Sequence, residues 1–332
     1  MELVNQALSG NRRAMAQLIS QVENDNSLAA TTRTTIYAHT GRARVIGVTG
    51  APGTGKSTLV CELAKAYRRA GQMVGIIAVD PTSPFTGGAI LGDRIRMRDL
   101  AGDPGIFIRS MASRGNLGGL AWATADAVKV LDAAGFDLVF VETVGAGQAE
   151  VDIARTAHTT IVVEVPGLGD DVQAIKAGIL EIADVFAVNK ADHEGADHAV
   201  MALRMMLDLD VGQTHTVMHH GRLMEAASAR GGADLAPAFW QPPIFKTVAT
   251  RGEGIAELAE AILAHRAHLE QSGSLTQRER ERAAAELETI VQQEALRRAL
   301  ACTDPASLAV LIDQIVHREL DPYTASQRLL NL

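Results

Sequence analysis

The sequence predicts an α/β fold: a mostly parallel sheet with helices on both faces, an N-terminal helical cap and a C-terminal helical extension. Short runs rich in β-branched residues alternate with stretches of helical periodicity, which is typical of a parallel sheet with crossover helices. The runs are continuously apolar, so they suit strands in the interior of the sheet. In chain order they are RVIGVT, MVGIIAVD, GIFIRS, FDLVFVET, TTIVVEVP, DVFAVNK and PIFKTVA. Ligands of such sheets bind at the carboxyl ends of the strands.

Residues 1–42 are predicted to form the helical cap, because apolar side chains recur there at helical spacing among polar residues. These side chains are Leu8, Met15, Leu18, Ile19 and Val22. The strand-like runs begin at Arg44, so residues 43–272 are predicted to form the sheet domain. Its last helix is expected to begin near Gly254.

Residues 273–332 are predicted to form the C-terminal extension. The stretch LTQRERERAAAELETIVQQEALRRAL has the charge-rich pattern of an amphipathic helix. Two more helices are expected at the Asp-Pro pairs 304–305 and 321–322, because proline is favoured in the first turn of a helix. Amphipathic helices of this kind are suitable elements for dimerisation.

The composition restricts the classes of function. With 39 acidic and 31 basic residues, the net charge of −8 argues against a general nucleic-acid-binding surface. No apolar run approaches the roughly 20 residues that span a bilayer, and the first residues lack the pattern of a secretory signal. Two cysteines, Cys61 and Cys302, are too few for a disulfide framework. We therefore expect a cytoplasmic protein that binds neither nucleic acid nor membranes.

A glycine-rich loop follows the first predicted strand. Its letters GAPGTGKS match the pattern G-x-x-x-x-G-K-[ST], and a helical stretch follows, so the sequence predicts a P-loop NTPase. Backbone N–H groups of such a loop surround phosphates, the lysine reaches the outer phosphates, and the hydroxyl binds magnesium. The residues expected to contact the nucleotide here are Gly50, Ala51, Pro52, Gly53, Thr54, Gly55, Lys56, Ser57 and Thr58.

Three carboxylates are candidates for the surroundings of Mg²⁺. Glu142 ends an apolar strand before a glycine-rich loop, as the Walker-B acid does, with glutamate in place of the commoner aspartate. Asp80 ends another apolar strand, and Asp93 follows in a glycine-containing segment that we interpret as a switch loop. The alternatives are an ordinary strand-end acid for Glu142 and an ordinary surface loop for the segment of Asp93. Together with Lys56, we predict catalytic roles for Asp93 and Glu142.

The letters NKAD after a later strand match the N-K-x-D pattern of guanine-binding GTPases. Asp192 is expected to accept hydrogen bonds from guanine N1–H and the 2-amino group, a donor pair that adenine lacks. Asn189 would support the loop, and the stem of Lys190 would cover the base. By their order along the chain, Thr247, Val248 and Ala249 are candidates for the loop at the guanine O6.

Several long motifs resemble the MeaB/ArgK family of methylmalonyl-CoA mutase-associated GTPases, which is related to the methylmalonic aciduria type A protein. They are AVDPTSPFTGGAILGDRIRM, RGNLGGLAWATADAV, VETVGAGQAEVDIA, VPGLGDDVQAIKAGILEIAD and VNKAD. The resemblance implies a SIMIBI-class GTPase that uses GTP, GDP and Mg²⁺ and serves as chaperone of an adenosylcobalamin-dependent acyl-CoA mutase. In this family the chaperone gates cofactor loading and protects or reactivates the mutase, which stimulates hydrolysis.

By matched position, Lys56 and Ser57 would be P-loop residues, and Asp80, Asp93 and Glu142 would surround Mg²⁺. Asn189 and Asp192 would read guanine. The segment VPGLGDDVQAIK would sense the partner, through Asp170, Asp171, Gln173 and Lys176. Family members are homodimers, so the resemblance also implies a homodimer.

Two positions depart from the family pattern. His158 stands where an aspartate is usual, and Val248 replaces a serine of the base-binding loop. Two other functions stay open: a P-loop kinase, after an older name of some relatives, and a nickel-insertion GTPase. A nickel protein needs a histidine-rich metal site; here His215, His219 and His220 fit either a helix face or a solvated connection.

Overall fold

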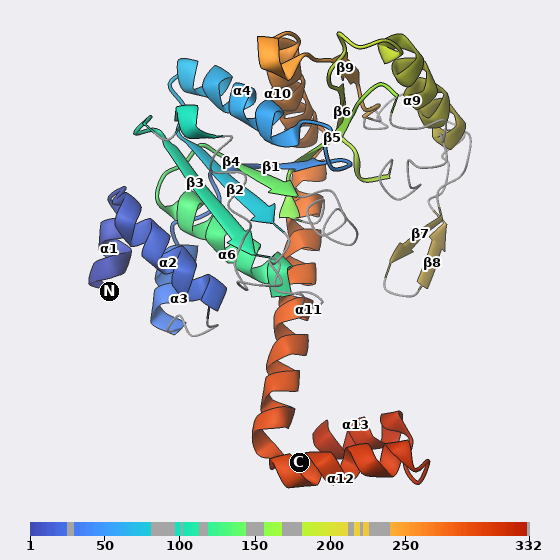
Figure 1. The fold of residues 1–332 in the computed structure, drawn as a ribbon. Coiled ribbons are helices and arrows are strands. Elements are labelled where there is room, and N and C mark those ends of the chain that lie inside the picture. Colours follow the sequence, from blue (N-terminus) through green and yellow to red (C-terminus); the bar gives the residue numbers. More distant parts are fainter. Residues whose placement is uncertain are drawn as a thin grey trace. The chain divides into compact units, whose positions relative to one another are not determined.

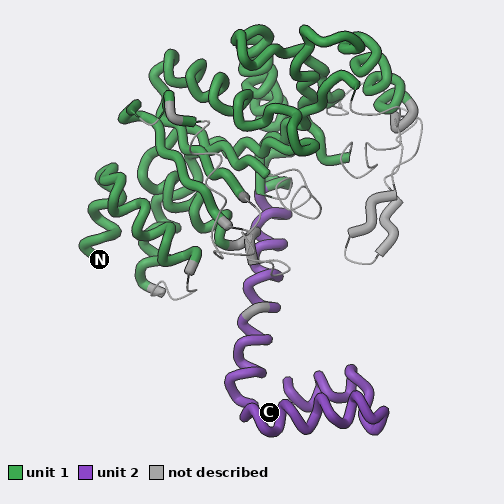
Figure 2. Tube along the Cα trace, viewed as in Figure 1, with its two compact units in different colours: residues 1–278 green, residues 279–332 purple. Residues whose placement is uncertain are grey.

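The computed structural model describes residues 1–24, 30–80, 97–100, 102–112, 119–143, 156–167, 181–211, 216–219, 222–225 and 240–330. The chain divides into two compact units, Met1–Arg278 and Glu279–Leu332, which Figure 2 shows in green and purple. The first unit holds the sheet and the helices packed on it. The boundary that the sequence indicates after residue 272 stays a prediction.

The first unit is built on a seven-stranded sheet in the order β3-β2-β4-β1-β5-β6-β9, in which every pairing is parallel (Figure 1). Each of the seven apolar runs forms one strand, so the predicted α/β class with its parallel sheet is confirmed. The strands are β1 (Arg44–Thr49), β2 (Val74–Asp80), β3 (Ile106–Ala112), β4 (Leu138–Thr143), β5 (Thr159–Glu164), β6 (Val185–Val188) and β9 (Ile244–Lys246).

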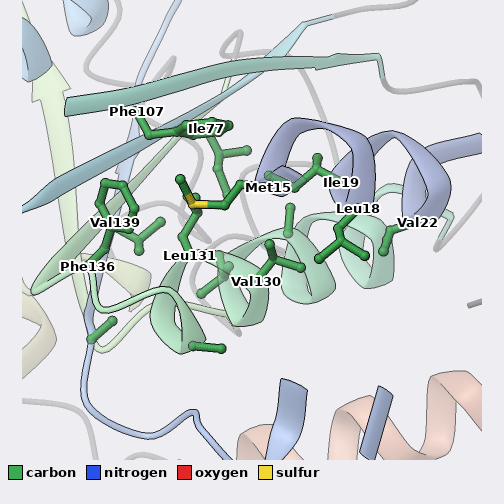
Figure 3. Packing of buried hydrophobic residues seen from close by; sticks show 14 of the residues in the cluster. Met15, Leu18, Ile19, Val22, Ile77, Phe107, Val130, Leu131, Phe136 and Val139 are labelled. Atoms are coloured by element: carbon green, nitrogen blue, oxygen red, sulfur yellow. The ribbon is translucent and has the colours of Figure 1, made fainter. Parts of the chain in front are cut away.

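One face of the sheet is covered by α6 (Gly119–Ala133) and the N-terminal helices α1 (Glu2–Leu8), α2 (Arg12–Asn24) and α3 (Ala30–Tyr37). Figure 3 shows Met15 of α2 among Ile77 and Phe107 of the sheet and Leu131 of α6. Four of the apolar positions that predicted the helical cap, Met15, Leu18, Ile19 and Val22, are at most 2% exposed. Burying each such side chain stabilises the fold by about 1.5–3 kcal/mol.

The opposite face packs against α4 (Lys56–Arg69) and α10 (Ile255–Gln271). Alternation along a strand divides the side chains between the two faces: Ile46 and Val48 of β1 point to this side, whereas Val45 points to the side of α6. The helix α9 (Ala196–Val211) packs on β6 and β9, with a smaller core around Phe186.

An ion pair fastens the helical cap to the edge strand of the sheet. Arg109 of β3 donates to Glu23 Oε2 at 2.7 Å and to Ser20 Oγ at 3.0 Å, and both partners belong to α2. Because both charged side chains are less than one fifth exposed, solvent screens this pair less than a surface pair.

A second, two-stranded sheet consists of β7 (Thr216–His219) and β8 (Arg222–Glu225), which pair antiparallel. A helix face is therefore wrong for His219, which pairs with Arg222 across the two strands. The β-branched Thr216 and Val217 favour the extended conformation. His215 and His220 lie outside the described residues.

The second unit contains the remainder of α11 (Ser274–Cys302) with α12 (Pro305–Val316) and α13 (Pro322–Leu330). Both Asp-Pro helix starts are confirmed. Asp304 accepts the backbone N–H groups of residues 306 and 307, and Asp321 accepts those of residues 323 and 324. Each proline stands in the first turn, where its missing N–H leaves no hydrogen bond unmade.

Among the described helices, no single one has both the length and the apolar character of a membrane span. The bent pair of α11 and α12 passes that test jointly, on length and composition alone.

Candidate nucleotide-binding site

The predicted phosphate loop connects the carboxyl end of β1 with the start of α4 at Lys56. Two of its glycines are sterically required. Gly50 has φ +135°, and a Cβ there would lie 2.1 Å from the carbonyl oxygen of Val163. Gly55 has φ +90°, and a Cβ there would lie 2.5 Å from Asn189 Nδ2. The loop therefore touches β5 on one side and the N-K-x-D segment on the other, with room for glycine alone.

Lys56 lies almost completely buried within its own loop. Its Nζ donates to the carbonyl oxygens of Gly50 at 2.8 Å and Ala51 at 3.0 Å, and the residue is 5% exposed. The ammonium group is thus held beside the N-terminus of α4, where backbone N–H groups lack partners within the helix. An ammonium beside a helix N-terminus is an arrangement that attracts phosphate.

Ser57 and Glu142 meet beneath this loop. Ser57 Oγ donates to Glu142 Oε1 at 2.5 Å, and the two residues are 7% and 4% exposed. The parallel register pairs Glu142 with Val48 of β1, which places the carboxylate beside the strand that enters the loop. A hydroxyl and a carboxylate are oxygen ligands of the kind that Mg²⁺ prefers, so these two residues fit a magnesium site.

The pKa of Cys61 shows how apolar the surroundings of α4 are. Burial, together with the negative charge of Glu142, raises the pKa of this thiol to about 12. The thiol therefore stays protonated at neutral pH and is not a nucleophile.

The other predicted carboxylates are placed only in part. Asp80 ends β2, and its preceding residue Val79 pairs with Thr143, so the backbone of Asp80 lies at the same edge of the sheet as Glu142. The structure does not describe its side chain or any part of Asp93. The residues predicted to sense the partner also lie outside the described part of the chain: Asp170, Asp171, Gln173 and Lys176.

Asn189 joins the phosphate loop to the predicted base-binding loop. Its Nδ2 donates to the carbonyl oxygen of Thr54 at 2.8 Å. Its Oδ1 accepts from Thr247 Oγ1 at 3.2 Å and from the backbone N–H of Ala249 at 3.1 Å. The residue is 3% exposed, so these hydrogen bonds are shielded from water. The side chain of Asn189 thereby connects the phosphate loop, the N-K-x-D segment and the predicted base-binding loop, which are far apart in the sequence.

Lys190 adds a second link, since its Nζ donates to the carbonyl oxygen of Gly53 at 2.9 Å. Its φ of +54° turns the chain sharply after β6. Asp192 follows, and its Oδ2 lies 3.1 Å from Arg251 Nη2. The sequence did not single out Arg251, because nothing in its local pattern marks a residue that meets a carboxylate 59 positions earlier in the chain.

The predicted base-binding loop is held by backbone contacts. Val248 and Glu253 form an isolated antiparallel bridge, and the short helix η2 (Ala249–Arg251) lies between them. The side chain of Val248 is buried. A buried position suits the apolar valine, and its backbone N–H donates to the carbonyl oxygen of Glu253 at 3.1 Å.

A buried polar cluster occupies the opposite, amino-terminal end of β5 and β6. Asp184 accepts from Arg278 Nη2 at 2.9 Å and from the N–H of Thr160 at 2.8 Å, and lies 3.2 Å from His265 Nε2. Burial lowers the pKa of His265 to about 4; the charge of Asp184 raises the pKa in part, and the charge of Arg278 lowers it. His158 Nδ1 accepts the N–H of Val45 at 2.9 Å, an acceptor role that the family's aspartate is also able to fill.

Among the described residues, no group of three or more His, Cys, Asp and Glu side chains is arranged to hold a metal ion.

The chain is similar to known proteins along nearly its whole length. The model of a family described as methylmalonyl Co-A mutase-associated GTPase MeaB matches residues 15–304. A Pyrococcus horikoshii protein that carries a GTPase name is 49% identical over 329 residues, 99% of this chain and 96% of its own. The GTPase ArgK of Escherichia coli is 34% identical over 307 residues, 91% of this chain and 87% of that protein. A crystal structure described as a LAO/AO transport system kinase has a TM-score of 0.69 and 26% identity, and the match covers 99% of this chain and 95% of that one.

Proposed function

Because this chain belongs to the family of methylmalonyl-CoA mutase-associated GTPases, we propose that it serves as chaperone of an adenosylcobalamin-dependent acyl-CoA mutase, foremost methylmalonyl-CoA mutase. The family is one of GTPases, so the chain is a GTPase and binds guanine nucleotides. The finer proposal is that GTP binding and hydrolysis gate cofactor loading and protect or reactivate the mutase. The observation that carries it is the family match over residues 15–304.

The proposed phosphate site is the loop of residues 50–58. Hydrolysis of GTP adds water to the γ-phosphorus and breaks its bond to the β–γ bridging oxygen, so negative charge accumulates on the leaving GDP. Lys56 and the N–H groups at the start of α4 are fixed donors that would stabilise this charge. Supporting this role, Lys56 is held in place by two carbonyl oxygens of its own loop.

Ser57 and Glu142 are the proposed magnesium ligands with direct structural support, since their oxygens lie together beside the loop. Asp80 and Asp93 are proposed to complete the surroundings of the ion, and Asp93 and Glu142 to take part in catalysis. When bound, Mg²⁺ supplies positive charge to the phosphate oxygens.

Guanine would be selected by Asp192, whose carboxylate offers two acceptors to N1–H and the 2-amino group. Adenine has no matching donor pair and would leave the carboxylate unpaired. The backbone of Thr247, Val248 and Ala249 is proposed to contact O6. The hydrogen bonds of Asn189 favour this arrangement, because they tie this loop to the phosphate loop.

The partner is proposed to act through the segment that contains Asp170, Asp171, Gln173 and Lys176. Hydrolysis by the isolated chain is expected to be slow and to accelerate when the mutase docks. We also propose a cytoplasmic homodimer formed through the C-terminal helices, without nucleic-acid or membrane partners. Large apolar side chains exposed on these helices favour dimerisation: Leu287, Ile290, Val291, Leu296, Leu300, Val310, Ile312 and Val316.

A kinase is the second candidate, because the solved structure that covers 99% of this chain is described as a transport system kinase. A kinase would transfer the γ-phosphoryl group to an acceptor other than water, and it would have no need for guanine selection. Radiolabelled γ-phosphate separates the two: a GTPase releases inorganic phosphate, whereas a kinase leaves label on the acceptor.

The decisive test is a pull-down of binding partners from an extract of the native source, with the chain loaded with a non-hydrolysable GTP analogue as bait. GTPase assays with the captured mutase follow. We expect recovery of an acyl-CoA mutase and at least severalfold faster GTP turnover in its presence. Lys56→Ala is the control that should abolish this turnover. Recovery of no mutase, or a mutase without effect on turnover, contradicts the chaperone role and leaves the GTPase activity intact.

A further inference from the structure

The carboxylate proposed to read guanine already has a cationic partner in this chain. Arg251 Nη2 lies 3.1 Å from Asp192 Oδ2, and both residues stand at the rim of the proposed base site. The partner comes from η2, the short helix that follows the proposed O6-binding loop. No role in base recognition follows from the sequence pattern of this residue.

The two candidate partners of Asp192, a cationic guanidinium and a neutral guanine edge, present their N–H donors in the same geometry. An arginine guanidinium presents parallel N–H donors on nitrogens that share one carbon. The guanine edge presents N1–H and the 2-amino group, whose nitrogens also share one carbon. Both groups match a carboxylate in the same way, so a guanidinium at Asp192 Oδ2 occupies a position that the guanine edge would need.

The surroundings of Arg251 restrict movement to its side chain. The backbone is fixed by the bond from Ala249 N–H to Asn189 Oδ1 and by the bridge between Val248 and Glu253. The side chain itself is 58% exposed, and its Nη1 lies 3.9 Å from Glu253 Oε1. The carboxylate of Glu253 therefore lies close enough to pair with the guanidinium when it leaves Asp192.

We propose that Arg251 competes with guanine for Asp192 and so lowers the affinity of this GTPase for its nucleotide base. The inference rests on the proposed role of Asp192 in base recognition. Arg251 acts as an internal mimic of the guanine edge: its side chain must leave the carboxylate before the base docks, and it returns when the nucleotide leaves. The competition is weak because an exposed ion pair is worth little.

The test measures GDP binding to the full chain by calorimetry and by stopped-flow kinetics. Arg251→Ala is expected to lower the Kd for GDP about two- to fivefold, the range that corresponds to an exposed ion pair. The gain should lie in the association rate, because in the bound state Arg251 no longer touches Asp192; the dissociation rate should stay unchanged. Arg266→Ala is the matched control, since it removes the same charge from an i,i+4 pair with Glu270 on α10 and should leave the Kd unchanged.

A second arm ties the effect to Asp192. Xanthine carries a carbonyl where guanine carries the 2-amino group, so Asp192→Asn should bind XDP in preference to GDP. In this background the carboxylate is gone, and adding Arg251→Ala should change the Kd for XDP by less than about 1.5-fold if the two sites act only through each other.

Two results overturn the proposal. One is an unchanged or higher Kd for GDP in Arg251→Ala, with faster dissociation showing that Arg251 holds the bound base. The other is an equal gain in the Asp192→Asn background, which assigns the effect to general charge. Failure of the proposed function looks different: the unaltered chain would not prefer GDP over ADP, or Asp192→Asn would leave GDP binding intact.

Discussion

Replacing Asn189 with alanine is expected to destabilise the first unit and to weaken guanine-nucleotide binding at the same time. The amide of Asn189 bonds to three groups: the carbonyl oxygen of Thr54, the hydroxyl of Thr247 and the N–H of Ala249. These groups belong to the phosphate loop and the base-binding loop. Without the amide, the two loops lose the side chain that holds them in register.

The size of the loss in unfolding free energy follows from the burial of the three groups that lose their hydrogen bond to Asn189. Thr54 and Thr247 are 0% and 1% exposed, and Ala249 is 3% exposed, so none of the three groups turns to bulk water. A buried polar group left unsatisfied costs about 1–3 kcal/mol. A water molecule entering the space of the lost side chain offsets part of this, so we expect a total of about 2–4 kcal/mol.

Thermal unfolding with and without GDP is the assay. At about 2 °C or more per kcal/mol, the melting temperature of Asn189→Ala should fall by at least about 4 °C, and the Kd for GDP should rise at least about thirtyfold if binding reports the same loss. Thr247→Val removes one of the three bonds and should cost about 1 kcal/mol. Gln292→Ala changes an exposed amide of α11 and should be silent.

Gly55 supplies the internal check of this reasoning. A Cβ at residue 55 would lie 2.5 Å from Asn189 Nδ2, so Gly55→Ala forces the two apart in addition to straining a backbone with φ +90°. In the Asn189→Ala background the clash disappears and the strain persists. The double variant should therefore be less destabilised than the sum of the single ones. Additivity within about 0.5 kcal/mol, or a silent Asn189→Ala, refutes the contact as described.

Three further outcomes are expected. At pH 8 a thiol reagent should modify the exposed Cys302 and leave Cys61 unmodified until urea unfolds the chain. The reason is that burial raises the pKa of Cys61 to about 12. Rapid modification of both cysteines in the folded chain would contradict this. The free energy of unfolding should fall as the pH drops from 6.5 toward 4, since unfolded His265 binds a proton in that window while the folded residue, with its pKa near 4, stays neutral. His265→Gln should flatten this part of the pH profile in urea titrations, and an unaltered slope would assign it to other groups. Asp132→Ala should lower the free energy of unfolding by about 2–4 kcal/mol in the same titrations, because the carboxylate accepts the N–H groups of residues 41, 42 and 43 at 2.6, 3.1 and 2.9 Å; a change below about 0.5 kcal/mol would be the level of an ordinary surface site.

The sheet was predictable because its central strands are buried on both sides and so leave continuous apolar runs. Phe140 and Phe186, for example, lie in the middle of such runs and are 0% exposed. The order of the strands was not predictable from the sequence. β1 lies between β4 and β5, and no local pattern in the run RVIGVT indicates which neighbours it pairs with.

The candidate site was predictable where function restricts single residue types, as in the phosphate loop and the N-K-x-D segment. It was not predictable where two ordinary residues meet through the fold. Arg251 is an arginine in a polar loop, and only the hairpin-like turn between Val248 and Glu253 brings it to Asp192. The small sheet of β7 and β8 was not predicted either, because each strand has only four residues, too few for a periodicity to be recognised.

The topology also shortens the path between the nucleotide and the proposed partner-sensing segment. The carbonyl oxygen of Val163 lies so close to Gly50 that no side chain fits between the phosphate loop and β5. β5 ends one residue later, at Glu164, and the segment VPGLGDDVQAIK begins at the next residue, Val165. The phosphate loop therefore contacts the strand whose carboxyl end leads directly into that segment. β5 is also paired with β1 from Ile46 to Thr49, and β1 is the strand that enters the phosphate loop. Backbone hydrogen bonds between neighbouring strands thus connect the phosphate loop to the strand that precedes the proposed partner-sensing segment.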